Sequence, residues 1–131
     1  MNAPSVDIKD MLEDETSLGL TFATNLFIGR IPDAPDDCVV IVDTSGFAQD
    51  LTFDKAEKYE RPSVQIMVRN NDYLTGFDLL NDIKDVLHGK GHTTVNGAYY
   101  SVIMCADAPS FLNWDENNRA HFVLNIDMQR R

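Results

Sequence analysis

The sequence predicts an α+β fold: a mixed, mainly antiparallel β-sheet with two α-helices packed on one face and a long loop or arm. Two observations support this fold class. Segments with the composition of strands outnumber segments with helical spacing. Near the end of the chain, Asn96-Gly97 is the turn dipeptide of a two-residue antiparallel hairpin. The 131 residues fit one domain, which we expect to span residues 1–131.

The chain is expected to begin with a short amphipathic helix. Ser5 is the predicted N-cap, and Asp7 suits the positive end of the helix dipole. The apolar residues Ile8, Met11 and Leu12 share one face. Residues 21–28 follow and are rich in strand formers, and residues 32–37 form a turn with two prolines.

The middle of the chain contains two predicted strands and an irregular segment between them. Residues 38–42 form a continuous apolar run, which is typical of a strand buried on both faces. Residues 63–69 alternate between apolar and polar positions. The pattern is lost over residues 47–61, which we therefore predict to be a long loop or arm.

The clearest helix is expected between Tyr73 and His88, with Asn71-Asp72 as its cap and Gly89 after its end. The hairpin over residues 93–100 comes next, and its second strand runs to about Ala106. Residues 109–118 are predicted to form a loop. The last strand places five apolar side chains on one face: Ala120, Phe122, Leu124, Ile126 and Met128.

The net charge of −10 makes the chain poorly suited to gripping DNA, because DNA-binding proteins draw affinity from lysine and arginine. Residues 1–62 carry 13 acids and 5 bases, a net of −8, and residues 63–131 carry 8 acids and 6 bases, a net of −2. An acidic surface would let DNA slide past it. The alternative is that the charge only keeps the protein soluble. No apolar run suggests a membrane span and no secretory signal is expected.

The two cysteines, Cys38 and Cys105, both lie in apolar stretches. We interpret them as free, buried thiols that behave as small hydrophobic residues. Folding in the cytosol is the corresponding expectation.

The motifs of catalysis and metal binding are missing from the sequence. His88 and His92 are separated by two glycines, so a helix would not hold both on one face. No nucleophile elbow or phosphate-binding loop is found, and residues 89–92 are interpreted as a connector. Asp115-Glu116 is interpreted as a polar turn rather than a calcium loop. We therefore predict no catalytic, cofactor or metal site, and no enzyme.

The predicted arm is the main candidate for an interface with another subunit or with a partner. It carries large apolar side chains among charges, and these either tuck under the domain or dock on another subunit. A second candidate is the outer face of the sheet, where an apolar residue interrupts the polar face of the last strand. The candidate residues are Phe47, Leu51, Phe53, Tyr59, Arg61 and Val123.

Several segments, taken in order, resemble a protein family of long-tailed bacteriophages, the minor capsid or tail-terminator (tail-completion) proteins. The segments cover most of the chain from about Ile8, and they are residues 25–29, 32–36, 43–46, 61–69, 72–73, 115–119 and 130–131. Ser45 and Asn118 depart from this resemblance, since glycine is common at both positions in the family.

The resemblance implies an α+β fold, a ring that is usually a hexamer, and a place in the virion at the head-proximal end of the tail tube. The partners would be other copies of the chain, the tail tube protein and a head-completion or stopper protein, with DNA passing through the lumen. Assembly would take place in the host cytoplasm. No cofactor or catalytic residue is implied.

Three other functions stay open at this point. A head-side connector or stopper would bind the portal complex instead of the tube. An acidic binding module, acting as a DNA mimic, would gather its acids on one face of a monomer. An enzyme would need a deep pocket that holds His92 or His121 with a carboxylate.

Overall fold

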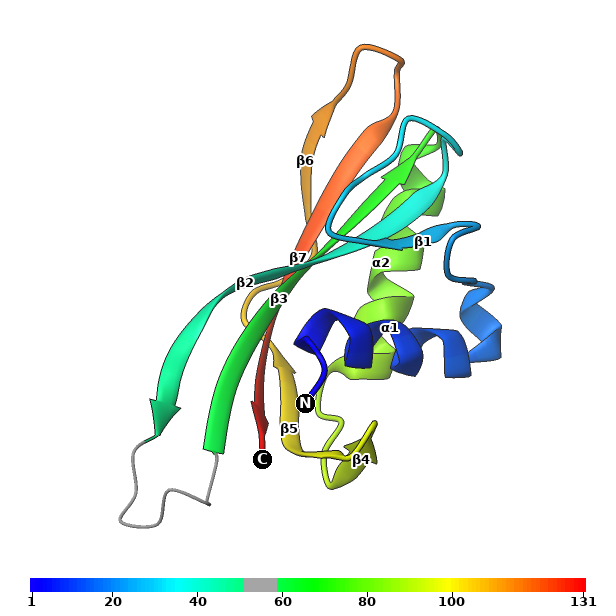
Figure 1. Ribbon diagram of the computed structural model, residues 1–131. Helices are drawn as coiled ribbons and strands as arrows, with labels where there is room; N and C mark the ends of the chain where they lie inside the picture. Colours follow the sequence, from blue (N-terminus) through cyan, green and yellow to red (C-terminus); the bar gives the residue numbers. More distant parts are fainter. Residues whose placement is uncertain (51–58) are drawn as a thin grey trace.

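A mixed seven-stranded sheet curls around one apolar core, and both α-helices lie on its inner face (Figure 1). The structure is a computed structural model that describes residues 1–50 and 59–131. Its elements are α1 (Pro4–Asp14), η1 (Thr16–Leu18), β1 (Leu26–Ile28), β2 (Cys38–Asp50), β3 (Tyr59–Asn70), α2 (Tyr73–Leu87), β4 (Thr93–Val95), β5 (Ala98–Cys105), β6 (Ser110–Trp114) and β7 (Ala120–Arg130).

The strand order is β1-β2-β3-β7-β5-β4, and β6 pairs with β7 beyond the end of β5. Among the strands of the described residues, β1 and β2 pair in parallel and the other strand pairs are antiparallel. The predicted fold class is therefore confirmed, including the two helices on one face. No helix among residues 1–50 and 59–131 is long and apolar enough to cross a membrane.

The core forms where the apolar faces of the helices meet the inner face of the sheet. Leu80, Ile83 and Leu87 of α2 are fully buried, as the helical spacing predicts. Every second residue of β7, from Ala120 to Met128, is buried against them. The first four residues of β2 are also buried, which confirms the prediction of a strand covered on both faces.

The prediction that Ser5 caps α1 is wrong. The helix begins at Pro4, and the N-cap position is Ala3, whose side chain makes no capping hydrogen bond. Instead, the backbone N–H and the hydroxyl of Ser5 donate to the carboxylate of Asp43 in β2, at 2.9 and 2.7 Å. An acid from the sheet thus satisfies the helix N-terminus, which favours negative charge.

The strand predicted over residues 21–28 is shorter than expected. The Asn25 side chain accepts from the backbone N–H of Thr21 and donates to the carbonyl of Gly19, so it stabilises a turn there. Only Leu26–Ile28 forms a strand, β1, apart from an isolated bridge at Phe22.

The C-terminal half confirms one local prediction and corrects another. Asn96 and Gly97 have φ values of 51° and 80°, the geometry that a two-residue hairpin turn requires. Asp72 caps α2 by accepting from the backbone N–H of Leu74, as predicted. Residues 109–118, however, are not all loop, because Ser110–Trp114 forms the strand β6.

Both cysteines are free thiols. Cys38 is buried and Cys105 is half-buried, and burial raises the pKa of each thiol. Such thiols react slowly at neutral pH and pack as small apolar residues.

Candidate assembly surfaces

The described residues of the predicted arm, 47–50 and 59–61, continue two strands rather than forming a loop. β2 runs on to Asp50 and β3 begins at Tyr59, so residues 47–50 and 59–61 pair with each other, contrary to the prediction of a segment without its own secondary structure. In Figure 1 this ribbon leaves the body of the molecule. Beyond Ile41, the outer side of β2 has no neighbouring strand within the described ranges. We keep the name arm for residues 47–50 and 59–61.

Two bulges explain why the sequence of the arm lacks a strand pattern. The pairing changes register between Thr44 and Phe47, and again between Phe47 and Asp50. Each shift inserts one extra residue into β2, and an extra residue reverses the alternation of the following side chains. A period of two therefore cannot appear in this part of the sequence.

The arm exposes the apolar side chains that the sequence singled out. Phe47 is 74% exposed and Tyr59 is 37% exposed, and Phe47 pairs with Arg61 across the ribbon. For these residues, the side chains do not tuck under the domain. Leu51 and Phe53 lie outside the described residues.

Gly46 allows the two strands of the arm to approach closely. A Cβ atom at this position would run into the backbone carbonyl of Arg61 and the backbone of Pro62. Only glycine fits such a contact without a shift of one strand.

We expect Gly46→Ala to loosen the arm and to cost about 1–3 kcal/mol of stability, because a rigid backbone blocks the added methyl group. Hydrogen exchange should be faster for the backbone amides of residues 59–61 and 63. The neighbouring Ser45→Ala, at an exposed position, is the control and should leave exchange unchanged. Equal hydrogen-exchange rates in both variants would show that the close approach at Gly46 does not stabilise the arm.

The base of the arm forms a cavity of about 270 Å³ with a positive and aromatic lining. The lining contains three arginines and one glutamate, in a chain whose net charge is −10. The Arg131 guanidinium lies over the rings of Tyr59 and Tyr99, at 5.9 and 5.1 Å from their centroids. The lining residues are Tyr59, Glu60, Arg61, Tyr99, Ser101, Gln129, Arg130 and Arg131.

A buried charge cluster connects the base of the arm to α1. The Arg130 guanidinium donates to Glu60 at 2.8 Å, to Asp7 at 3.3 Å and to the Tyr100 hydroxyl at 3.2 Å. Tyr100 in turn donates to Asp7 at 2.5 Å, and Asp7 is fully buried. Burial and the Asp7 carboxylate raise the pKa of Tyr100 well above its ordinary value. The cluster therefore holds Glu60, a residue of the arm, against the body of the domain.

A second group of exposed apolar side chains lies on β6 and the first turn of α2, at the end of the sheet away from the arm (Figure 1), and we call it the aromatic surface: Tyr73, Leu74, Phe111, Leu112 and Trp114. The ring centroids of Tyr73 and Phe111 are 5.2 Å apart, and those of Phe111 and Trp114 are 6.1 Å apart. Phe111 and Tyr73 both rest on the buried ring of Phe122, at 5.7 and 5.1 Å. The surface is therefore anchored on the core.

A bulge in β6 brings Phe111 and Trp114 to the same side of the sheet. Residues three apart in a regular strand face opposite sides. Here Phe111 pairs with Phe122 and Trp114 pairs with Ala120, and a register shift separates the two pairs. Phe122 and Ala120 share one face of β7, so Phe111 and Trp114 do as well. Both rings then meet Tyr73 at the start of α2.

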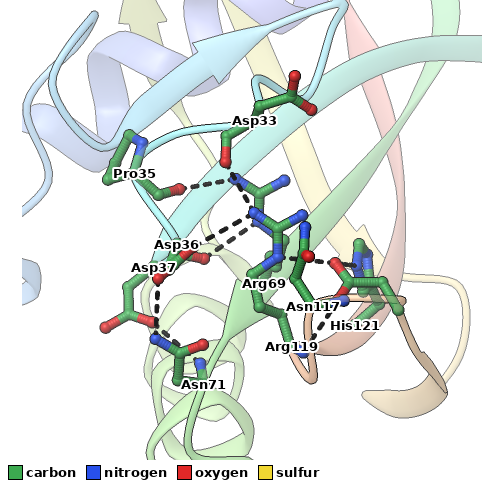
Figure 2. Close-up of polar contacts among 10 residues, drawn as sticks. Asp33, Pro35, Asp36, Asp37, Arg69, Asn71, Asn117, Arg119 and His121 are labelled. Atoms are coloured by element: carbon green, nitrogen blue, oxygen red, sulfur yellow. Dashed lines mark hydrogen bonds and ion pairs between the residues drawn. The ribbon is translucent and has the colours of Figure 1, made fainter.

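Two buried arginines fix the loops that flank the aromatic surface (Figure 2). Arg69 donates to the carbonyls of Asp36 and Pro35, at 3.0 and 2.6 Å. Arg119 donates to the carbonyl of Asp33 at 2.7 Å and to the Asp115 carboxylate at 2.8 Å. The turn that follows Trp114 is thereby joined to the loop over residues 33–37.

Asp115 organises this turn and confirms its interpretation as a polar turn. Desolvation alone would raise the pKa of its carboxyl, but His121 and the backbone N–H groups of Arg119 and Asn117 hold that pKa well below its usual range. His121 lies 3.0 Å from the same carboxylate. The Asp115 carboxylate thus holds His121 and the backbone N–H groups of Asn117 and Arg119 together, and these contacts stabilise the turn.

Val123 is not brought together with the arm. It is half-buried and pairs with Met67 on β3, six residues along that strand from Arg61. At about 3.3 Å per residue, this separation is roughly 20 Å. The sequence candidates therefore form one group at the arm and one separate residue on the outer face of the sheet.

The histidines considered as metal ligands have other partners. His88 accepts from the backbone N–H of Cys105 at 2.9 Å, and His92 contacts the Tyr99 hydroxyl at 2.6 Å. Within residues 1–50 and 59–131, no group of three or more histidine, cysteine, aspartate or glutamate side chains is arranged to hold a metal ion.

An α+β domain with exposed apolar surfaces at two ends of its sheet has the features of a protein that assembles with other proteins. Residues 6–131 match the family model described as bacteriophage tail terminator protein, and the chain belongs to this family. It is therefore a structural protein of the phage tail, and the family resemblance seen in the sequence is confirmed.

Comparison of structures supports the fold. A chain in a solved structure described as the virion of a native gene transfer agent (GTA) particle superposes with a TM-score of 0.68. The two sequences are 12% identical, and the alignment covers 98% of this chain and 94% of the other. A search of curated protein sequences finds no match.

Proposed function

We propose that the protein forms a closed ring of identical subunits, a hexamer, at the head-proximal end of the tail tube. The ring stops polymerisation of the tube and joins the tail to the head. Membership of the tail terminator family supports this function. The observation that carries the proposal is the arm, which leaves the body of the domain and exposes Phe47.

A projecting arm suits ring closure because a ring of identical subunits is built from contacts between two different surfaces of each subunit. Phe47, Tyr59 and Arg61 are the described residues that we propose for such a contact. Leu51 and Phe53 extend the proposal along the chain. Val123, on the outer face of the sheet, is proposed as a contact with the tube.

The size and charge of the domain are compatible with the passage of DNA through the ring. A domain of this length has a radius of gyration of about 14 Å, which corresponds to a sphere roughly 36 Å across. Six touching spheres enclose a hole about one sphere wide, and a DNA duplex fits through it. The net charge of −10 disfavours tight binding to the duplex.

The ring is tested by native mass spectrometry and negative-stain microscopy of the purified protein, alone and with tails assembled from tube protein. We expect hexamers in at least one of these samples and a ring at one end of each tube. Addition of the protein during tube assembly should shorten the tubes. Monomers in both samples, with tube length unchanged, would contradict the proposal.

The place of the protein in the virion is tested by pull-down against tube protein, head-completion protein and portal protein. A tail terminator should retain the tube protein, and it should bind the head-completion protein through the opposite face of the ring. Retention of portal protein without tube protein would instead favour a head-side connector.

A further inference from the structure

We propose that the aromatic surface is the receiving site for the arm of the neighbouring subunit, so that each ring contact joins the arm of one copy to the aromatic surface of the next. This inference rests on the proposed ring and adds the partner surface to it. The occupant of the aromatic surface is thus a second copy of this chain.

The exposure of the aromatic surface is the first observation in its favour. Leu74, Leu112 and Trp114 are 68%, 57% and 50% exposed. The surface contains half of the ten large apolar side chains that are exposed in the described part of the chain. Contiguous apolar patches with tryptophan and tyrosine are enriched at protein–protein contacts, where they contribute most of the binding energy.

Complementary charge identifies the occupant. Acidic side chains accompany the aromatic surface: Glu116 is two residues from Trp114, Asp72 precedes Tyr73, and Asp78 is one helical turn from Leu74. The arm base has the opposite character, since the exposed guanidinium of Arg131 lies over the rings of Tyr59 and Tyr99, while the buried Arg130 is compensated by Asp7 and Glu60. In an acidic chain, this positive and aromatic region fits an acidic and aromatic partner.

The placement of the two surfaces is the third observation. β6 lies at one end of the sheet and the arm projects from the other end (Figure 1). A subunit with complementary surfaces at opposite ends can bind one neighbour at each end, and such head-to-tail contacts form a ring when the rotation from one subunit to the next closes. The aromatic surface rests on Phe122 and its flanking turn is held by Arg119, so the receiving site is ordered before contact.

Two variants with complementary defects test the contact. Leu74→Asp with Leu112→Asp places charge in the aromatic surface and leaves the arm intact. Phe47→Asp with Arg131→Glu alters the arm and its base and leaves the aromatic surface intact. All four side chains are exposed, so we expect both variants to fold, and circular dichroism checks this. If the first variant does not fold, Leu74→Ser with Leu112→Ser replaces it.

Each variant alone should be monomeric by native mass spectrometry, with and without tail tubes. An equimolar mixture should form a 1:1 heterodimer and no ring, because only one intact arm and one intact receiving surface are present in each pair. Phe22→Asp, at a residue 44% exposed beside α1, is the control and should form rings as the wild type does.

The outcomes separate this inference from the proposed function. If wild-type rings form and the Leu74/Leu112 variant also forms rings, or if the mixture yields no heterodimer, the receiving site is wrong and the ring stands. If the wild type is monomeric with and without tubes, both the ring and its interface are wrong.

Discussion

Phe122→Ala is expected to lower the free energy of unfolding by about 3–5 kcal/mol, the usual cost of removing a buried phenylalanine ring. Phe122 is fully buried near the start of β7. Its ring contacts those of Tyr73, Phe77 and Phe111 at centroid distances of 5.1, 6.0 and 5.7 Å. The substitution therefore leaves a cavity and also removes the support of the aromatic surface. Urea denaturation measures the loss.

Phe111→Ala is the matched control, because Phe111 belongs to the same aromatic group but is 38% exposed. Its truncation leaves a smaller cavity, and we expect the free energy of unfolding to fall by about 1 kcal/mol. Similar losses in both variants would mean that Phe122 is not the anchor of the group. A variant with Phe122→Leu, which retains most of the buried volume, should fall between the two.

Arg130→Met is expected to lower the free energy of unfolding by about 3–5 kcal/mol, because removal of one member of a buried ion pair leaves the other charge without compensation. Arg130 is 7% exposed and Asp7 is fully buried. Without the guanidinium, Asp7 keeps the hydrogen bonds from Tyr100 and Asn96 but loses the cation beside it. The contact between β7 and the first residues of the arm, through Glu60, is lost as well.

The neighbouring Arg131→Met is the control, since Arg131 is exposed, and it should change stability by no more than about 0.5 kcal/mol. The double variant Asp7→Leu with Arg130→Met should be more stable than Arg130→Met alone, because no buried charge is left over. If the effects of the two substitutions on the free energy of unfolding simply add, Asp7 and Arg130 do not stabilise the fold as a pair.

The buried elements of the fold were predictable because the spacing of their apolar residues indicates which face is buried. Helical spacing at Leu80, Ile83 and Leu87 and alternation in β7 correspond to one buried face each. The hairpin was predictable from Asn96-Gly97, since few other dipeptides adopt two positive φ values. These signals are local in the sequence.

The errors arose where contacts between distant residues decide the structure. The carboxylate that accepts from the start of α1 belongs to Asp43, 38 residues from Ser5, so no local pattern reveals it. β6 was predicted as loop because its bulge breaks the alternation and all five of its residues are exposed. The outer parts of β2 and β3 were hidden by two bulges for the same reason.

The candidate surfaces were predicted in part. Phe47, Tyr59 and Arg61 stood out as apolar and charged residues without a pattern, and the structure places them at the arm. The aromatic surface was missed because Tyr73 and Trp114 are 41 positions apart and meet only through the pairing of β6 with β7 and the packing of α2. Its one local signal was the apolar run Phe111-Leu112 close to Trp114, within a segment otherwise interpreted as loop.

The bulges of the arm have a consequence for the soluble subunit. The outer side of β2 beyond Ile41 is an open strand edge in the described part of the chain, and a long, flat edge would pair with the edges of other molecules. Two register shifts within a few residues twist this edge and interrupt its row of hydrogen-bonding groups. The irregular ribbon therefore protects newly made subunits from indiscriminate aggregation until side-chain contacts select the correct neighbour.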